Sequence, residues 1–422
     1  MYLTETHQIT KKDNRWNEID NICFMSKNLY NCCLYEIRQY YLTNNTFITD
    51  KGYITSKASL YNILKNSVDF RNGMATRPMK SVFKQVETIF KSYFAAIKSY
   101  KENPSKFNGR PKLPYYKHKK DGRNIISFTH EAISFKKKGY AKLSMTNIEV
   151  KTRKKKGDVK EIRLVPTNLG FYKIEVVYNT IVSPKIVSDN FFGIDLGINN
   201  FVSLASNDPN IKSVIINGRA IKSINAFYNK LLAKKKSQLP KNVYTSKLIK
   251  HITKRRNNKI SDHIHKISKS IIQYTIMNSI SEIVIGYNEG WKNKINIGKR
   301  NNQNFVSIPY YKFISTLRYK CDLYGIAFTD REESYTSKCS FLDLEDIKKH
   351  DIYVGNRVKR GMFKSKNFSI NSDINGALNI LRKEKGNDVF LYNRNRSDSI
   401  RVFAVSPVKV NVSLRGTLRL TK

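Results

Sequence analysis

The spacing of hydrophobic residues changes twice along the 422-residue chain. Residues 1–10 alternate weakly between apolar and polar positions, which predicts a short strand. From about residue 16 to 100, apolar residues recur at three- and four-residue steps, which is typical of amphipathic helices. A polar, turn-rich stretch at 43–53 interrupts this pattern. A clear apolar stripe follows Pro78, a residue that suits the first turn of a helix.

A basic segment at 103–124 ends the helical part. It contains three prolines and two glycines among many Lys and Arg, so it predicts a boundary and no regular element. Residues 125–182 then read as short strands separated by turns, at the spacing of a small barrel or sandwich. Most of these strands alternate apolar residues with Lys or Arg, and we expect one face to be strongly positive.

The pattern changes again after Ser183-Pro184, where strands and helices alternate. The first of these elements are a buried strand, a tight polar turn and a second strand. The predicted elements are strands within 191–206, helices within 226–281, a strand at 283–285, a helix at 307–323, a strand at 325–328 and a helix at 373–383. Residues 387–422 read as a peripheral tail.

The charge of the chain points to a polyanionic partner. Lys and Arg number 77 against 33 Asp and Glu, a net charge of +44, which repels itself unless a polyanion neutralises it. The 25 Tyr and 22 Phe add surfaces on which unpaired bases can stack. A ribosomal-type basic protein is the alternative interpretation.

A membrane partner is not indicated, because no stretch approaches the roughly 20 apolar residues of a span and the start lacks a signal-peptide core. Five cysteines, two of them adjacent, form no disulfide framework and favour a reducing cytoplasm.

Two aspartates are the first candidates for chemistry. Asp195 ends a hydrophobic strand between Gly193 and Gly197, where an unpaired carboxylate is costly unless it is paired or binds a metal. Asp373 lies at the start of a predicted helix. Taken singly, Asp195 could cap a turn and Asp373 could cap the helix. Together, carboxylates at strand and helix ends are typical of an RNase H-like nuclease that binds two Mg²⁺ ions.

Several segments resemble the successive RuvC blocks of TnpB proteins, transposon-encoded relatives of the type V CRISPR effectors. They are GIDLGINN (193–200), IVIGYNEGWK (283–292), INIGKRNNQNFVSIPYYKFISTLRYKCDLYGI (295–326), EESYTSKCSFLD (332–343) and INSDINGALNILRK (370–383). Order and spacing together make the resemblance specific, which no single segment does. FNGRPKLPYYK (107–117) and the helix with Lys84 and Gln85 resemble the family's linking segment and recognition-lobe helix more weakly.

The resemblance implies an α+β multidomain fold with a helical recognition lobe, a small β-barrel (wedge) domain and a RuvC/RNase H-like α/β nuclease domain. The expected parts are the first wedge strand (1–15), the recognition lobe (16–102), the basic linker and wedge barrel (103–185), the first and second RuvC blocks (186–333), a degenerate insertion (334–370), the third block (371–386) and the peripheral tail (387–422).

The chain departs from the family at the second carboxylate. Most members carry a Glu after the strand of the second block, and this chain has Gly286 there. In order of preference, Glu333, Glu332 or Glu289 replaces it. The alternative is that none of the three binds metal and that the site is impaired.

A second departure concerns zinc. The family often carries two CxxC pairs between the second and third blocks, but residues 334–370 hold only Cys339 and His350. Structural zinc needs four ligands, so we expect no zinc, and this segment needs packing or nucleic acid for its order.

The resemblance implies an RNA-guided DNA endonuclease that uses Mg²⁺ or Mn²⁺, binds a guide RNA and cuts double-stranded DNA beside a short motif. Asp195, Glu333 and Asp373 would be the catalytic and metal-binding residues. The expected nucleic-acid contacts are Lys80, Lys84, Gln85, Arg110, Lys112, Tyr115, Tyr116, Lys117, Lys254, Arg255 and Arg256. One copy per guide RNA in a prokaryotic cytoplasm, associated with the nucleoid, is expected.

Two alternatives stay open. The first is an RNA-guided DNA-binding protein that no longer cuts and acts as a repressor, which Gly286 keeps open. The second is a basic RNA-binding protein without a DNA target, against which the order of the blocks argues.

Overall fold

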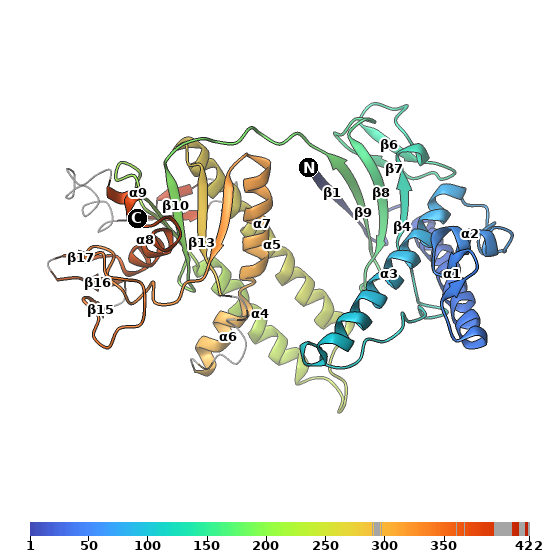
Figure 1. The fold of residues 1–422 in the computed structure, drawn as a ribbon. Helices are drawn as coiled ribbons and strands as arrows, with labels where there is room; N and C mark the ends of the chain where they lie inside the picture. Colours follow the sequence, from blue (N-terminus) through green and yellow to red (C-terminus); the bar gives the residue numbers. More distant parts are fainter. Residues whose placement is uncertain are drawn as a thin grey trace. The chain divides into compact units, whose positions relative to one another are not determined.

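The chain divides into two compact units, Met1–Thr180 and Ile181–Lys422 (Figure 1). The computed structural model describes residues 1–288, 290, 296, 298–359, 361–366, 368–391, 407–412 and 418–420. Both units combine helices with sheets, so the predicted α+β multidomain class is confirmed. Among the described residues, no helix is both long and apolar enough to cross a membrane.

The first unit contains two antiparallel sheets. One has the order β1-β9-β8-β4, and the other has the order β5-β6-β7. The strands of the larger sheet are β1 (Tyr2–Ile9), β4 (Ile126–Thr129), β8 (Val159–Pro166) and β9 (Tyr172–Asn179), and those of the smaller are β5 (Ile133–Ser134), β6 (Tyr140–Leu143) and β7 (Glu149–Lys151). The first strand therefore pairs with the last one of the unit, along its whole length.

The helices of the first unit share one hydrophobic core with these sheets. They are α1 (Trp16–Asn44), α2 (Lys57–Leu64) and α3 (Thr76–Glu102), with the short hairpin β2–β3 (Ile48–Thr49, Gly52–Tyr53) and two 3-10 turns at Pro104–Lys106 and His130–Ala132. The predicted stripe that follows Pro78 is buried in part. Val82, Val86 and Phe90 are almost fully covered, whereas Ile89, Tyr93, Phe94 and Ile97 are half-buried.

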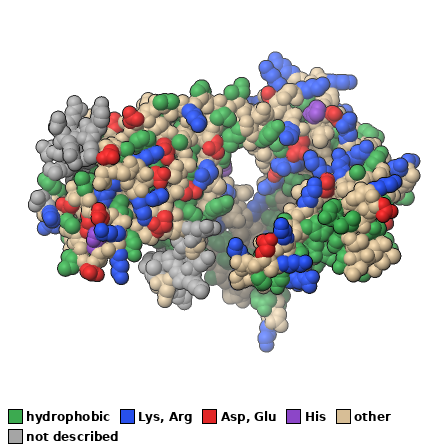
Figure 2. Space-filling model, viewed as in Figure 1, with side chains coloured by type: hydrophobic (Ala, Val, Ile, Leu, Met, Phe, Trp, Pro, Cys, Tyr) green, Lys and Arg blue, Asp and Glu red, His purple; other side chains and the backbone are tan. Residues whose placement is uncertain are grey.

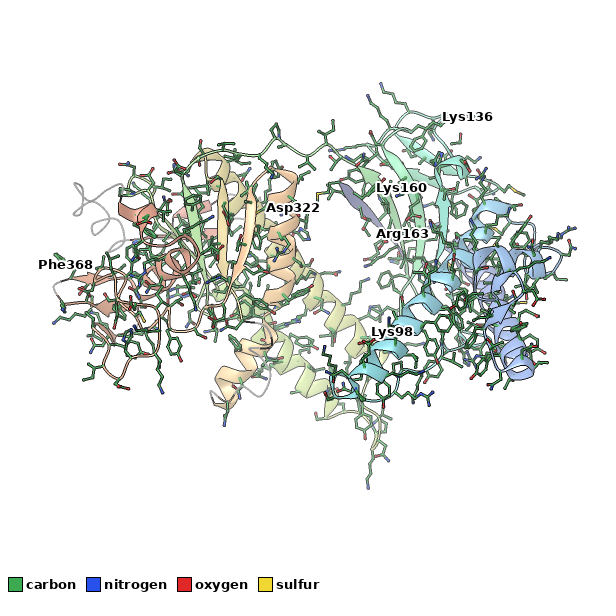
Figure 3. The ribbon with its side chains drawn as sticks, viewed as in Figure 1. Lys98, Lys136, Lys160, Arg163, Asp322 and Phe368 are labelled. Atoms are coloured by element: carbon green, nitrogen blue, oxygen red, sulfur yellow. The ribbon has the colours of Figure 1, made fainter. Side chains whose placement is uncertain are left out.

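The outer face of the larger sheet is less positive than the sequence predicts. Arg163 of β8 forms an ion pair with Glu175 of β9 at 3.0 Å, and Glu161 accepts a hydrogen bond from Ser127. Lys160 and Arg163 are labelled in Figure 3. Acidic residues on the paired strands neutralise part of this face. Elsewhere on the visible surface of the first unit, Lys and Arg outnumber Asp and Glu (Figure 2).

The second unit is built on a sheet with the order β14-β13-β10-β11-β12-β18-β19. Strands β10 (Phe191–Leu196), β11 (Asn200–Ser206) and β12 (Val214–Asn217) are antiparallel, whereas β13 (Glu282–Gly286) and β14 (Ala327–Arg331) run parallel to β10. This is the strand arrangement expected of the RNase H-like part. The helices are α4 (Arg219–Lys236), α5 (Lys247–Met277), α6 (Lys299–Ser307), α7 (Tyr310–Leu323), α8 (Ser372–Lys385) and α9 (Asp388–Leu391).

The two faces of this sheet pack against different helices. On β10, Phe192 and Ile194 belong to a core shared with α5 and α7, and the alternating residues Gly193 and Asp195 face α8. Gly193 lies so close to α8 that a Cβ atom there would come within 2.1 Å of the Ala377 carbonyl oxygen. Because side chains alternate between the two faces of a strand, Asp195 points to the same side as Gly193, toward the helix that carries Asp373.

The described part of the C-terminal tail is not peripheral, which corrects the prediction for 387–422. Strand β18 (Val408–Val412) pairs in parallel with β12, and β19 (Leu418–Leu420) pairs with β18. Val410 is buried in the sheet core, and Phe390 of α9 is buried against α8. The apolar runs of the tail are too short to predict that a strand there pairs with a sheet formed by residues far away in the sequence.

Packing and hydrogen bonds order the described part of the 334–370 segment. It contains the small sheet β15 (Asn356–Lys359), β16 (Met362–Lys364) and β17 (Ser369–Ile370). The buried Glu345 carboxylate accepts hydrogen bonds from the backbone N–H groups of Ser340 (2.7 Å) and Val354 (2.9 Å). Asn375 and Asn379 of α8 each donate a hydrogen bond to the Cys339 carbonyl oxygen. The buried carboxylate of Glu345 thus connects the loop of Ser340 to that of Val354. Among the described residues, no three His, Cys, Asp or Glu side chains are grouped so that they could hold a metal ion.

Replacement of Glu345 tests this crosslink. We expect Glu345→Ala to lower the free energy of unfolding by about 2 kcal/mol or more, because two buried N–H groups lose their acceptor. Asp346→Ala, at an exposed neighbour, is the matched control and should change little. Chemical denaturation measures both. A zinc-selective chelator should leave the melting temperature of the wild type unchanged, and a fall would contradict this account.

Candidate active site

Asp195 points from β10 toward α8. Its Oδ2 atom would lie 3.1 Å from a Cβ atom at Gly376, so the missing side chain of that glycine makes room for the carboxylate. The backbone of Asp195 is paired with Ser203 of β11. The contact with α8 favours a site residue over the alternative of a turn cap, because the carboxylate meets the helix.

Asp373 lies in the first turn of α8 but does not cap it. Asn371 is the N-cap, and its Oδ1 atom accepts hydrogen bonds from the N–H groups of Asp373 (3.0 Å) and Ile374 (3.3 Å). The Asp373 carboxylate instead accepts a hydrogen bond from Asn200 Nδ2 at 2.5 Å and lies 3.5 Å from Arg357 Nη2. The helix-cap interpretation is therefore wrong, and the carboxylate serves other contacts.

Glu333 occupies the space that a side chain at position 286 would fill. A Cβ atom at Gly286 would come within 2.8 Å of Glu333 Oε2 and within 2.5 Å of Ile380 Cδ1. The backbone of Glu333 is held on both sides, because its N–H donates to Asn288 Oδ1 (3.1 Å) and its carbonyl accepts from Thr336 Oγ1 (2.8 Å). A carboxylate thus reaches the region of Gly286 from a different strand end.

The other two glutamates differ from Glu333. Glu332 is exposed and forms an ion pair with Lys383 at 2.5 Å, and it accepts a hydrogen bond from the Ser334 N–H at 2.8 Å. These two hydrogen bonds lower the pKa of Glu332 to about 2. Glu289 lies outside the described residues.

The electrostatics couple the three carboxylates that the sequence singled out. Burial raises the pKa of Asp195 to about 8, and the nearby charges of Glu333 and Asp373 add to this rise, while Arg357 opposes it. Burial, with a contribution from Glu332, raises the pKa of Glu333 to about 7. Charges that raise the pKa of Asp195 must lie near it, so Glu333 and Asp373 are both neighbours of Asp195.

Tyr310 borders the cluster. Its side chain is fully buried and its hydroxyl donates a hydrogen bond to the Gly197 carbonyl oxygen at 3.1 Å. Burial and the charges of Asp195 and Glu333 raise the pKa of Tyr310. The phenol therefore stays neutral and helps to fix the turn after β10.

A polar pocket of about 930 Å³ opens beside Asp373. Its cationic lining consists of Arg219, Lys222, Arg357 and Lys409, and its amide lining includes Asn199, Asn200, Asn217, Asn371 and Asn411. Such a lining suits the phosphates of a nucleic-acid backbone. The pocket gives an extended anion access to one of the three carboxylates.

The donor chemistry suits Mg²⁺ or Mn²⁺, because hard cations take oxygen ligands. Burial is the main cause of the raised pKa values of Asp195 and Glu333, and nearby carboxylates add to it. A bound cation would stabilise the charged forms of both side chains. Within the described residues, however, no three acidic, His or Cys side chains lie close enough to form a finished metal cage.

Arg357 and Asn200 belong to this site and were missed in the sequence. Asn200 is the last residue of the GIDLGINN segment, which contains Asp195, so the sequence could have indicated that it lies near the carboxylates. Arg357 lies in β15, within the segment interpreted as degenerate, and no pattern linked it to Asp373. Only the fold of 334–370 brings it there.

The predicted nucleic-acid contacts of the first unit divide into two groups. Lys84, Arg110, Lys112 and Tyr115 are exposed. The others make contacts within the unit: Lys80 lies over the Tyr61 ring, Gln85 exchanges hydrogen bonds with the buried Asn124, Arg38 stacks on Tyr116, and Lys117 lies over Tyr30.

The basic run of α5 divides in the same way. Arg255 is exposed and Lys254 is half-buried. Arg256 donates hydrogen bonds to Asn225 Oδ1 (2.8 Å) and to the Ser307 carbonyl oxygen (2.5 Å), which connects α5 to α4 and to the end of α6. Arg256 therefore makes structural contacts within the second unit, as Gln85 does within the first.

Comparisons with known proteins agree with this architecture. A family model described as a probable transposase (OrfB_IS605) matches residues 172–292, and a model of the Cas12f1-like TNB domain matches residues 310–380. No curated protein matches the chain. The two family models follow one another along the chain, from the last strand of the first unit into α8 of the second.

One solved structure with a TM-score above 0.5 shares the fold. A cryo-EM structure of a Cas12f1–sgRNA–target DNA complex has a TM-score of 0.53 and 16% identity, over 86% of this chain and 83% of that chain. The structure of the mini RNA-guided endonuclease Cas-phi3 has a TM-score of 0.47 and 12% identity, over 90% and 92% of the two chains.

The raised pKa of Asp195 makes a prediction about stability. An unfolded Asp loses its proton near pH 3.8 and the folded one near pH 8, so the folded state binds more protons between these values and its stability falls as the pH rises. Without divalent cations at pH 8, we expect Asp195→Asn to raise the melting temperature by about 2–4 °C, and much less at pH 5.

Asp322→Asn is the matched control, because Asp322 is an exposed carboxylate of α7 (Figure 3). Thermal unfolding at both pH values measures the effect. An equal gain for both variants, or no gain for Asp195→Asn at pH 8, would contradict the raised pKa of Asp195.

Proposed function

Because this chain belongs to a TnpB/Cas12f-like family, we propose that it is an RNA-guided, Mg²⁺-dependent DNA endonuclease. The observation that carries the proposal is the position of three carboxylates beside α8: Asp195 lies against Gly376, Asp373 lies in the first turn, and Glu333 lies against Gly286, which packs on Ile380 of this helix. Three partly buried carboxylates side by side are costly to the fold, which favours a catalytic use.

The proposed partners are a guide RNA and double-stranded DNA. A net charge of +44 favours large polyanions, and the Cas12f1 neighbour was solved with an sgRNA and target DNA. In this proposal base pairing with the guide supplies most of the sequence specificity, and the protein contacts backbones.

Asp195, Glu333 and Asp373 would hold the metal ions, which would activate water and stabilise negative charge on the phosphate. The other residues position these ligands: Asn200 orients Asp373, while Asn288 and Thr336 fix the backbone of Glu333. Arg357 pairs with Asp373 at 3.5 Å and lines the pocket, so its guanidinium is available to a backbone phosphate of the substrate.

A repressor that has lost cleavage is the second candidate. It was supported by Gly286, which replaces the usual Glu of the family. The close approach of Glu333 Oε2 to the position of a Cβ atom at residue 286 weakens this candidate, because a carboxylate occupies the region after all.

One experiment separates the two. The protein is co-expressed with the RNA transcribed from the flank of its own gene and is offered a plasmid library with a randomised motif and Mg²⁺. Depletion of particular motifs that disappears in Asp195→Ala supports the nuclease. Specific binding without depletion would support the repressor.

The preference for Glu333 gives a sharper prediction. We expect Glu333→Gln to lower the cutting rate by at least about 100-fold, since loss of even an indirect metal partner costs 10- to 100-fold. Glu332→Gln is the matched control, because Glu332 is paired with Lys383 at the surface, and it should keep most activity. Single-turnover cleavage measures both rates. If Glu289→Gln alone abolishes cutting, the assignment to Glu333 is wrong.

The space at Gly286 makes an independent prediction. A methyl group there collides with Glu333 Oε2 and Ile380, so Gly286→Ala should slow cutting by about 10- to 100-fold through displacement of the carboxylate. Gly157→Ala is the control, because nothing lies within 4 Å of a Cβ atom at that glycine. Normal cutting by Gly286→Ala, together with an unchanged melting temperature, would argue that Glu333 does not act from this position.

A further inference from the structure

A groove between α4 and α5 is not used by the active site described above. The two helices pack side by side (Figure 1). The groove has a volume of about 440 Å³ and is lined by Ser223, Ile224, Phe227, Tyr228, Leu231, Ile252, Arg255, Arg256 and Lys259. This volume is in the range of pockets that bind small molecules.

The floor of the groove is apolar and partly rigid. Phe227 is 70% exposed, and its ring makes no aromatic contact within the described part of the chain. Beside it, the Tyr228 hydroxyl shares a hydrogen bond with Thr253 Oγ1 at 3.0 Å, and Arg256 lies over the Tyr228 ring. The groove therefore offers an open aromatic face next to a fixed one.

The rim of the groove is cationic. Arg255 and Lys259 are exposed, and they make no hydrogen bond or ion pair within the described part of the chain. Helix α4 contains no acidic residue, and α5 contains only Asp262. A partner that enters this groove must therefore combine flat apolar groups with negative charge.

We propose that the groove binds an unpaired nucleotide of the DNA strand that is cut. The base stacks on Phe227, and Arg255 and Lys259 contact the phosphates on either side. This inference rests on the proposed function and adds a binding subsite to it. Stacking on an aromatic ring tolerates every base, so the subsite suits a target whose sequence varies with the guide.

The position of the groove along α4 favours the cut strand over the guide RNA. Arg219 and Lys222, in the first turn of α4, line the pocket beside Asp373, and Ser223 is the first residue that lines the groove. The same helix thus leads from the carboxylates to the exposed phenyl ring. In this proposal, the strand that reaches Asp373 continues along α4 to the groove.

Cross-linking tests the occupant without any need for cutting. The full protein is bound to its guide RNA and target DNA in the presence of a chelator, which prevents cutting. An iodinated pyrimidine is placed at successive positions, either in the DNA strand that is to be cut or in the RNA. Irradiation should attach one position of the cut strand to Phe227, and mass spectrometry identifies the peptide. Attachment of the RNA at Phe227, or of neither strand, would overturn the proposal.

Kinetics give a second measurement. Phe227→Ala should lower the cutting rate by about fivefold or more, the effect of one lost stacking contact, while the affinity for guide RNA stays unchanged. Phe227→Trp should restore the rate. Tyr244→Ala is the control, because Tyr244 is 82% exposed and lies between the two helices in sequence, outside the groove.

The outcomes separate this inference from the proposed function. A wild-type complex that cross-links DNA at Phe227 but never cuts would disprove the endonuclease and leave the subsite intact. If the Phe227→Ala variant cuts as fast as the wild type, the subsite alone is disproved. A fall in RNA affinity for Phe227→Ala would assign the groove to the guide.

Discussion

The candidate site depends on how closely α8 packs against β10 and β13. A Cβ atom at Gly193 would lie 2.1 Å from the backbone of α8, and one at Gly286 would meet Ile380 of the same helix at 2.5 Å. Because these strands carry no side chain at the two positions, the helix lies directly on the sheet. Asp373 at the start of α8 and Asp195 at the end of β10 then share one region. A side chain at either glycine would lift the helix and separate the carboxylates.

The segment before α8 holds the other side of the helix. Asn375 and Asn379 donate hydrogen bonds to the Cys339 carbonyl oxygen, and Arg382 donates to that of Glu345. Glu333 lies at the start of this segment and Arg357 lies inside it. The contacts that fix α8 therefore also position a third carboxylate and the cation that faces Asp373. A segment that lacks the family's zinc ligands retains a structural task in this way, through a buried carboxylate and two amides.

The sequence predicts much of this architecture, because period-two strands and period-three-to-four helices follow from burial alone. It also identifies Asp195 and Asp373, since carboxylates beside glycines in apolar segments have few structural uses. It does not reveal Arg357, whose approach to Asp373 depends on a turn of 334–370 with no periodic signal. Strand β18 was missed for a related reason, since pairing with β12 joins residues about two hundred positions apart. Contacts between distant segments leave little trace in local pattern.

Gly286 and Glu333 are best understood together: the side chain missing at position 286 leaves the space that the Glu333 carboxylate occupies. Read from the sequence, the glycine suggests a lost ligand, and it supports a protein that no longer cuts. In the structure, the missing side chain leaves room that Glu333 enters, and a carboxylate in that room costs stability because burial raises its pKa to about 7. A chain released from catalysis has no reason to keep this cost, since a neutral residue would pack there without it. The retained glutamate is therefore an argument for cleavage, drawn from the same position that first argued against it.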